Sequence, residues 1–359
     1  MDGIQITAKH KLETISKKEL FNNVDSVKIK ITKALLLPED FETLSGDNNV
    51  EYPIIPARVA IGKIVETCLE QTSDMTRGTR VFPHPEVACG KCYECSNGKH
   101  SACSSLQIAG KTTDGFLRDF AVFAVEDISI LSSSIQTQDD KPLIIDNSPL
   151  NNRITDKQAL FIDHVALCHK IIDAIHLKKG EHVVIVGGNL CGIILAQLVI
   201  YYQGIPILVD NNEKNIQLAQ SCGLYYTLFN YSNVDKSVAE LTGARLAKKV
   251  VYMTGSNLNA DIAMKLSGYN ATVCFAGFGT PGIKVNFSPA ILKQLNFTCV
   301  NNGYGYIDSA INLIATGAVD TSLFNIPVVK RDHAIEKIQE IAKSDDTDAC
   351  SKMLIIDVE

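Results

Sequence analysis

The chain has 359 residues, 46% hydrophobic and 21% charged, which is the balance of a globular protein long enough for two domains. Its net charge of -6 provides no basic surface for phosphate backbones or anionic lipid, so neither nucleic acid nor a membrane is an expected partner. The first residues lack the basic and apolar regions of a signal peptide, and the odd number of cysteines, 11, predicts a reducing, cytoplasmic location without a disulfide framework.

The first part of the chain contains short β runs separated by turns. The turn sequences include Pro83-His84-Pro85 and Asp114-Gly115. The β runs lie at 27–34, 54–65, 80–82 and 120–125. Such dense turns predict that residues 1–151 form a compact, barrel-like β domain.

Four cysteines of this domain lie close together in the pattern C-x2-C-x2-C-x7-C. They are Cys89, Cys92, Cys95 and Cys103. Four thiolates from one loop satisfy tetrahedral zinc and leave no coordination position open for a substrate, so the pattern predicts one structural zinc per chain. A ferredoxin-type cluster is the alternative, but its run ends in C-x3-C-P.

After residue 155 helical and strand patterns alternate. A polar stretch with two prolines, 139–153, predicts the crossing between domains, and 157–174 reads as a helix. Strand patterns follow near Val183, Ile205, Lys249, Thr272 and Phe297. We expect a doubly wound parallel sheet of six strands within 152–302, of which these patterns locate five. A helix at 307–316 and a strand at 353–358 are expected to return to the first domain, which makes 303–359 its last segment.

The stretch from Val183 to Asp210 is the strongest signal for a cofactor. It has no charge before Asp210 and is long enough to span a membrane, but glycines at both strand junctions favour a strand, a turn, a buried helix and a second strand. In such a unit the helix N-terminus binds the pyrophosphate of a dinucleotide, and the acid binds the adenosine ribose. The predicted cofactor-binding residues are Gly187, Gly188, Asn189, Leu190, Cys191, Gly192 and Asp210.

The glycine pattern departs from G-x-G-x-x-G at one position. Its three places fall on Gly187, Asn189 and Gly192, so asparagine replaces the middle glycine. Asparagine tolerates a positive φ better than other side chains, so we expect the turn to persist with weaker cofactor affinity. Asp210, which no arginine follows, favours NAD over NADP; the alternative is that it only ends a strand.

In their order and spacing these features resemble the zinc-containing medium-chain alcohol dehydrogenases, especially the sorbitol and threonine dehydrogenase branch. The resemblance is carried by YPIIP at 52–56, GKIVE at 62–66, RGTRV at 77–81, DGFLRDF at 114–120, the cysteine cluster and the glycine turn. It implies an α/β protein with a GroES-like barrel domain and a Rossmann domain, NAD(H)-dependent oxidation or reduction at an alcohol or carbonyl carbon, and a homodimer or homotetramer.

The three ligands of the family's catalytic zinc have no counterpart. Matched by spacing, the ligand cysteine is Leu37, the ligand histidine is Arg58, and the third ligand is Ile162, with Asp163 one step along. The loss of all three together predicts that the catalytic zinc is absent. A rebuilt metal site from Asp163, His164 and Cys168 is a weaker alternative, because two soft ligands do not specify zinc without a third.

Three residues at these positions are candidates for catalysis. Arg58 could act as an electrophile or bind an anionic group of the substrate. Glu39, in place of the family's proton-relaying hydroxyl, could serve as general acid or base, and His164 is a further proton-transfer candidate. The alternatives are a salt bridge between Arg58 and Glu39 in the former metal pocket and a packing role for His164.

The sequence thus predicts an NAD(H)-dependent oxidoreductase that acts on a small polar molecule, with Arg58 favouring an anionic one. Two other functions remain open. One is an NAD-binding sensor that has lost catalysis, which the asparagine and the missing zinc ligands both favour. The other is a metal-free reductase of conjugated double bonds or quinones.

Overall fold

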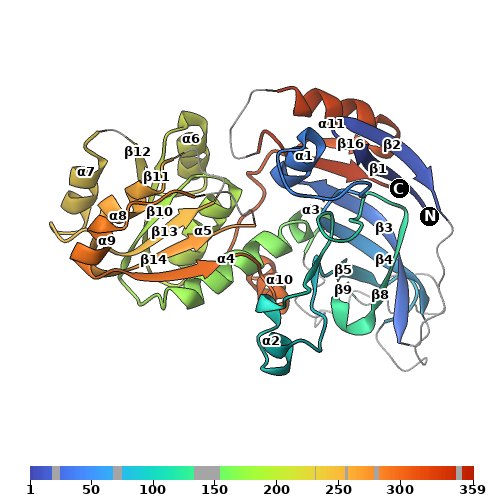
Figure 1. The fold of residues 1–359 in the computed structure, drawn as a ribbon, viewed down its shortest axis with the longest axis horizontal. Coiled ribbons are helices and arrows are strands. Elements are labelled where there is room, and N and C mark those ends of the chain that lie inside the picture. Colours follow the sequence, from blue (N-terminus) through green and yellow to red (C-terminus); the bar gives the residue numbers. More distant parts are fainter. Residues whose placement is uncertain are drawn as a thin grey trace. The chain divides into compact units, whose positions relative to one another are not determined.

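The computed structural model describes residues 1–17, 25–67, 75–132, 154–230, 232–254, 258–278, 283–344 and 350–359. They group into two units, shown in Figure 1. The described residues of 1–163, 326–346 and 351–359 form the β-rich unit, and those of 164–325 and 347–350 form the α/β unit.

The β-rich unit is built on a sheet of seven strands. Six follow the order β16-β17-β3-β4-β5-β9, and β8 also pairs with β3. Their bounds are β3 Ser26–Leu36, β4 Val59–Thr67, β5 Arg80–Pro83, β8 Phe120–Ala124, β9 Ile128–Ser132, β16 Val328–Lys330 and β17 Leu354–Asp357. Two antiparallel pairs accompany it: β1 Asp2–Ala8 with β2 Lys11–Ser16, and β6 Glu86–Val87 with β7 Gln107–Ile108. The α-helices are α1 Pro38–Ser45, α2 Tyr93–Ser96, α3 Asp156–Ala159 and α11 Ala334–Ala342.

The predicted β runs of this unit are largely present as strands. Alternating apolar residues of β3, such as Ile29 and Ile31, are fully buried in its core. The run expected at 54–65 is a strand only from Val59 onward. Its first part is a turn, because Pro56 has no N–H to donate and Ala57 has a positive φ of 76°.

The α/β unit has a six-stranded parallel sheet in the order β12-β11-β10-β13-β14-β15. The strands are β10 His182–Val186, β11 Ile205–Asp210, β12 Tyr226–Phe229, β13 Ala247–Met253, β14 Ser267–Ala276 and β15 Asn296–Val300. The helices are α4 Ile162–Ala174, α5 Leu190–Tyr201, α6 Glu213–Ser221, α7 Val234–Leu241, α8 Asp261–Leu266, α9 Ser288–Lys293 and α10 Ile307–Ala315. The order reverses between β10 and β13, which is the arrangement of a doubly wound sheet. The predicted fold class is confirmed.

Several details differ from the prediction. β12 was not among the strands that we located, and the helix expected at 157–174 is divided into α3 and α4. Residues 303–325, including α10, belong to the α/β unit, so the return to the β-rich unit begins at Ile326. The predicted crossing at 139–153 and the boundary at 151 lie outside the described residues.

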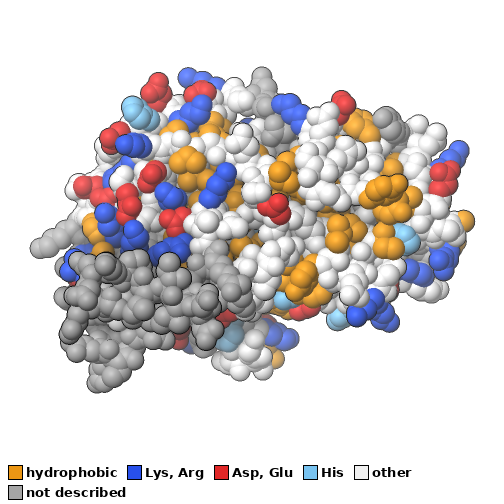
Figure 2. All heavy atoms as spheres, turned by 180° about the vertical axis from the view of Figure 1, so that it is seen from behind, with side chains coloured by type: hydrophobic (Ala, Val, Ile, Leu, Met, Phe, Trp, Pro, Cys, Tyr) orange, Lys and Arg blue, Asp and Glu red, His pale blue; other side chains and the backbone are white. Residues whose placement is uncertain are grey.

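Helix α5 explains the long apolar stretch of the sequence. Its residues from Leu190 to Val199 are buried on all sides of the helix, as expected for a helix inside a doubly wound domain. None of the helices in the described ranges combines the length and apolarity needed to cross a bilayer. On the face shown in Figure 2, acidic and basic side chains are interspersed, in keeping with a net charge of -6.

Candidate functional site

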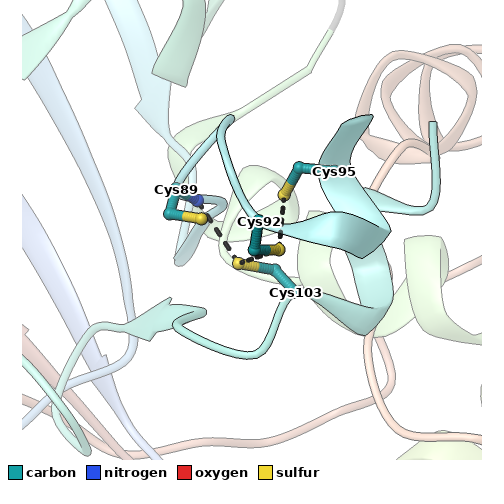
Figure 3. A group of neighbouring side chains, drawn as sticks. All are labelled: Cys89, Cys92, Cys95 and Cys103. Atoms are coloured by element: carbon teal, nitrogen blue, oxygen red, sulfur yellow. Dashed lines mark hydrogen bonds between the residues drawn. The ribbon is translucent and has the colours of Figure 1, made fainter. Parts of the chain in front are cut away.

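The four cysteines of the β-rich unit converge on one point, as Figure 3 shows. All four ligand atoms lie within 4.8 Å of one another. The sulfur of Cys92 is 3.5 Å from that of Cys95 and 3.9 Å from that of Cys103. Thiolates bound to a tetrahedral zinc at about 2.3 Å lie about 3.8 Å apart, close to the two sulfur–sulfur distances of Cys92, so the cluster suits a zinc ion.

Backbone hydrogen bonds lower the pKa of Cys89 and Cys92, whereas burial raises the pKa of Cys95 to about 12. Hydrogen bonds from the backbone N–H groups of Cys95 and Ser104 lower the pKa of Cys92 to about 5. Helix α2 carries Cys95, and the cluster is closed by Cys103 after a short 3₁₀ turn. Among the described residues, no other group of three or more His, Cys, Asp or Glu side chains is arranged to hold a metal.

The glycine turn of the α/β unit lies between β10 and α5. Gly187 has a φ of 108°, a conformation that favours glycine, and its N–H donates to the carbonyl of Val209 at 2.9 Å. A Cβ at Gly192 would overlap the carbonyl oxygen of Gly187. The first and third glycines therefore have the roles that the motif assigns to them, namely the tight turn and the close packing of helix on strand.

Asn189 has a different role from the expected one. Its φ is −67° and its ψ is 174°, so the expectation that asparagine is tolerated here through a positive φ is wrong. Asn189 is the N-cap of α5, and its side-chain oxygen accepts the N–H of Gly192 at 3.0 Å. One of the helix N–H groups that could bind a pyrophosphate is therefore already engaged by the protein.

Asp210 ends β11 as predicted. Its carboxylate accepts the backbone N–H groups of Gly188 and Asn212, the latter at 2.7 Å, and the residue is only 5% exposed. Beside it, the backbone N–H of Asn230 donates to the Asp210 carbonyl, and Asn230 lines a groove of about 700 Å³. The groove also borders α7 and α8 and is large enough for a nucleoside.

Arg58, which the resemblance matches to the family's ligand histidine, belongs to a buried ion-pair cluster of the β-rich unit. The Nε of Arg58 donates to Asp163 Oδ2 at 2.8 Å, and its Nη2 bonds to Glu86. Arg58 is 8% exposed, Glu86 is 4% exposed and Asp163 is fully buried. Leu37 is also buried. We refer to Arg58, Asp163 and Glu86 as the Arg58 cluster.

The Arg58 cluster changes two expectations about Arg58. The predicted salt bridge between Arg58 and Glu39 is replaced by pairs with Asp163 and Glu86, and these two carboxylates raise the pKa of Arg58 further above its usual range. One guanidinium faces two carboxylates, so the cluster carries one net negative charge. The inference that Arg58 favours an anionic substrate therefore loses its basis.

Glu39 lies in the first turn of α1 and is partly buried. Burial raises its pKa, the charge of Asp163 raises it further, and the charges of Arg58 and Lys111 lower it. Its carboxyl bonds to its own backbone N–H, and in the described part of the chain no other side chain bonds to it. Glu39 thus has the raised pKa of a proton-transfer group, and the only hydrogen bond of its carboxyl among the described residues is the one to its own backbone.

His164 follows Asp163 in α4 but belongs to the α/β unit. It is buried and packs edge-to-face on Phe278, with ring centroids 5.4 Å apart. The thiol of Cys168 donates to the carbonyl of Cys191 at 3.2 Å, and Asp163 bonds to Arg58. The alternative of a metal site rebuilt from Asp163, His164 and Cys168 is therefore not favoured by this geometry.

The sequence reasoning missed Glu86 and Asp40. Glu86 follows Pro85 in an ordinary turn sequence, and its partner Arg58 is 28 residues away in the chain. Asp40 accepts two backbone N–H groups, from Leu37 and Ala57. By spacing it matches the aspartate that follows the proton-relaying hydroxyl in the family, but it was assigned no role from the sequence.

Comparison with known proteins identifies the class. The alcohol dehydrogenase GroES-like domain matches residues 23–132. An uncharacterized zinc-type alcohol dehydrogenase-like protein of Haemophilus influenzae is 26% identical over 300 residues, which cover 83% of this chain and 82% of that protein. A sorbitol dehydrogenase of Halalkalibacterium halodurans is 24% identical over 278 residues, 75% of this chain and 74% of the relative.

Solved structures have the same fold. An alcohol dehydrogenase of Thermotoga maritima has a TM-score of 0.84 at 16% identity, covering 100% of this chain and 99% of that chain. A short chain alcohol dehydrogenase of Escherichia coli, complexed with NADH, has a TM-score of 0.83 at 18% identity with the same coverage.

A GroES-like unit joined to a doubly wound unit, with relatives of this kind, defines an alcohol dehydrogenase-like oxidoreductase. The predicted resemblance to the medium-chain alcohol dehydrogenase superfamily and the predicted enzyme class are thus confirmed by the domain match and by the relatives.

Proposed function

We propose that this protein is an NAD(H)-dependent oxidoreductase that transfers hydride at an alcohol or carbonyl carbon of a small polar molecule, without a catalytic zinc. The observation that carries the proposal is the Arg58 cluster, because it pairs with carboxylates the residue that the resemblance matches to a ligand of that zinc. Cys89, Cys92, Cys95 and Cys103 would bind one structural zinc per chain, which stabilises the lobe and takes no part in the reaction.

The cofactor would bind at the turn from Gly187 to Gly192, with Leu190 and Cys191 supplying backbone N–H groups, while the N–H of Gly188 bonds to Asp210. The Asp210 carboxylate and the groove beside Asn230 support a place for the adenosine part. NAD⁺, when bound, accepts the hydride. Asn189 already satisfies the Gly192 N–H, so we expect weaker binding than a glycine at this position would give.

Glu39 would transfer the proton. In the oxidising direction its carboxylate takes the hydroxyl proton of the alcohol while the carbinol hydrogen leaves as hydride, and the products are a ketone or aldehyde, reduced cofactor and a protonated Glu39. Arg58 would hold Asp163 and Glu86 in place. Because its guanidinium is paired with these two carboxylates, we do not expect it to be the main contact of the substrate. His164 would act through packing, since it is buried against Phe278.

The proposal is tested by metal analysis and by one pair of variants. Metal analysis of the purified protein should give one zinc per chain, and a value of two would contradict the proposal. Glu39→Gln should lower NAD-dependent turnover about 10²–10⁴-fold on a panel of alcohols and carbonyl compounds. Glu42→Gln is the matched control, because Glu42 lies on the same helix but is exposed. Equal turnover in both variants would remove Glu39 from the mechanism.

A second candidate function is an NAD-binding sensor without catalysis. The Asn189 cap favours it, because it weakens the pyrophosphate site and would be tolerated in a protein with no need for turnover. Fluorescence titration with NADH followed by a turnover screen separates the two. Tight binding with no turnover across the panel would establish the sensor, and absence of binding would contradict both.

We also propose a homodimer or homotetramer, which light scattering can test.

A further inference from the structure

Asp40 links the two segments that carry Glu39 and Arg58. Its Oδ2 accepts the backbone N–H of Leu37 at 2.9 Å, and its Oδ1 accepts that of Ala57 at 2.8 Å. Leu37 is the N-cap of α1, whose first turn contains Glu39, and Ala57 immediately precedes Arg58. One carboxylate therefore bonds to the backbone of both segments.

The turn that presents Arg58 depends on such external hydrogen bonds. Ala57 has a φ of 76°, in the left-handed region that costs a residue with a Cβ roughly 1–2 kcal/mol. The carbonyl of Ala57 accepts the N–H of Phe116 at 2.8 Å, and Asp114 Oδ1 accepts the N–H of Ile55 at 2.9 Å. Asp40 and Asp114 thus each bind one end of this turn, but of the two only Asp40 also bonds to the Glu39 helix.

The surroundings of Asp40 are apolar, so the link has little competition from solvent. Asp40 is buried and lines a cavity of about 10 Å³, together with Ile6 of β1, Leu12 of β2 and Ile338 of α11. The charged groups that act on it are Glu39 and Arg58. Burial, with the charge of Glu39, raises the pKa of Asp40 to about 7.

We propose that Asp40 is a positioning residue for the reaction, whose carboxylate fixes Glu39 relative to the Arg58 cluster. The proposal rests on the proposed function, in which Glu39 transfers the proton. A displacement of about 1 Å at such a group is enough to lower the rate about 10²-fold.

The test compares Asp40→Asn with Asp114→Asn. The amide nitrogen of asparagine cannot accept an N–H, so each variant loses acceptor capacity at one end of the same turn. In Asp40→Asn we expect kcat to fall about 10–100-fold with little change in KM, and the acidic limb of the pH profile, which reports Glu39, to shift. Asp114→Asn should leave that limb in place. If Asp40→Asn does not fold, Asp40→Glu takes its place. This variant keeps the charge but moves the carboxylate away from both N–H partners, so we expect the same loss of kcat.

Equal losses of kcat in the two asparagine variants, with an unmoved limb, would overturn the proposal and leave Asp40 a structural residue. If the wild-type protein shows no NAD(H)-linked turnover, the proposed function fails and a second measurement decides the role of Asp40. The titration of Glu39 can be followed by ¹³C NMR of glutamate-labelled protein, with the resonance assigned through Glu39→Gln. We expect Asp40→Asn to move this titration and Asp114→Asn to leave it unchanged, and the reverse would refute the inference.

Discussion

Replacement of Arg58 by methionine tests whether the Arg58 cluster stabilises the β-rich unit. The guanidinium compensates two carboxylates that are 0% and 4% exposed, so its removal leaves uncompensated buried charge. Breaking a buried ion pair by removing one partner costs about 3–5 kcal/mol. For a unit of this size about 1 kcal/mol corresponds to roughly 2–4 °C, so we expect Tm to fall by roughly 6–20 °C.

Arg80→Met is the matched control. Arg80 also pairs with an aspartate of the same unit, Asp156, at 2.5 Å, but the two side chains are 23% and 32% exposed. A partly solvated pair of this kind contributes about 1 kcal/mol or less. Scanning calorimetry of the zinc-loaded protein measures both variants. If Arg58→Met lowers Tm no more than Arg80→Met, the reasoning about buried charge is wrong.

Three further outcomes are expected. Cys95→Ser should reduce the bound zinc in metal analysis and lower the Tm of the β-rich unit, because the thiolates stabilise the lobe through the ion; unchanged zinc would exclude Cys95 as a ligand. Asn189→Gly should tighten NADH binding several-fold in a fluorescence titration, since the Gly192 N–H is released, and should cost only a few tenths of a kcal/mol in stability; weaker binding would contradict the capping argument. Asp40→Asn should flatten the pH dependence of urea unfolding. Burial raises the pKa of Asp40 from 3.8 to about 7 in the folded protein, so the unfolded chain releases this proton first and wild-type stability falls as pH rises between those values; an identical slope in the variant would refute this.

The features that the sequence predicts well are those whose parts lie close together in the chain. The cysteine cluster needs only the spacing from Cys89 to Cys103, and the glycine turn only that from Gly187 to Gly192. In both cases the backbone conformation depends on residues that are close together in the chain, so it produces a recognisable spacing of cysteines or glycines in the sequence. The apolar strands of the parallel sheet are predicted for the same reason, because burial on both faces produces continuous β-branched runs.

The features that the sequence did not predict depend on long-range pairing. Arg58 bonds to Glu86 and Asp163, which are 28 and 105 residues away. No spacing rule connects such residues, and an acid next to a proline or at the start of a helix has many ordinary explanations. Asn189 shows a different limit: asparagine suits both a positive φ and a helix N-cap, and only the backbone angles decide between them.

The side chains that the resemblance matches to the zinc ligands oppose metal binding in more than one way. Leu37 removes a thiolate, and Arg58 replaces a neutral ligand with a cation that bonds to Asp163 at 2.8 Å. A metal ion on the same carboxylate would lie within a few ångströms of the guanidinium. At about 4 Å and an effective dielectric constant of about 20, two unit charges repel by about 4 kcal/mol, and a divalent ion roughly doubles this cost. The cation therefore opposes metal binding in addition to the loss of ligands. Replacement of Arg58 by histidine alone would remove this repulsion but would leave Leu37 and Ile162 at the other two matched ligand positions, so all three positions would have to change to rebuild the zinc site.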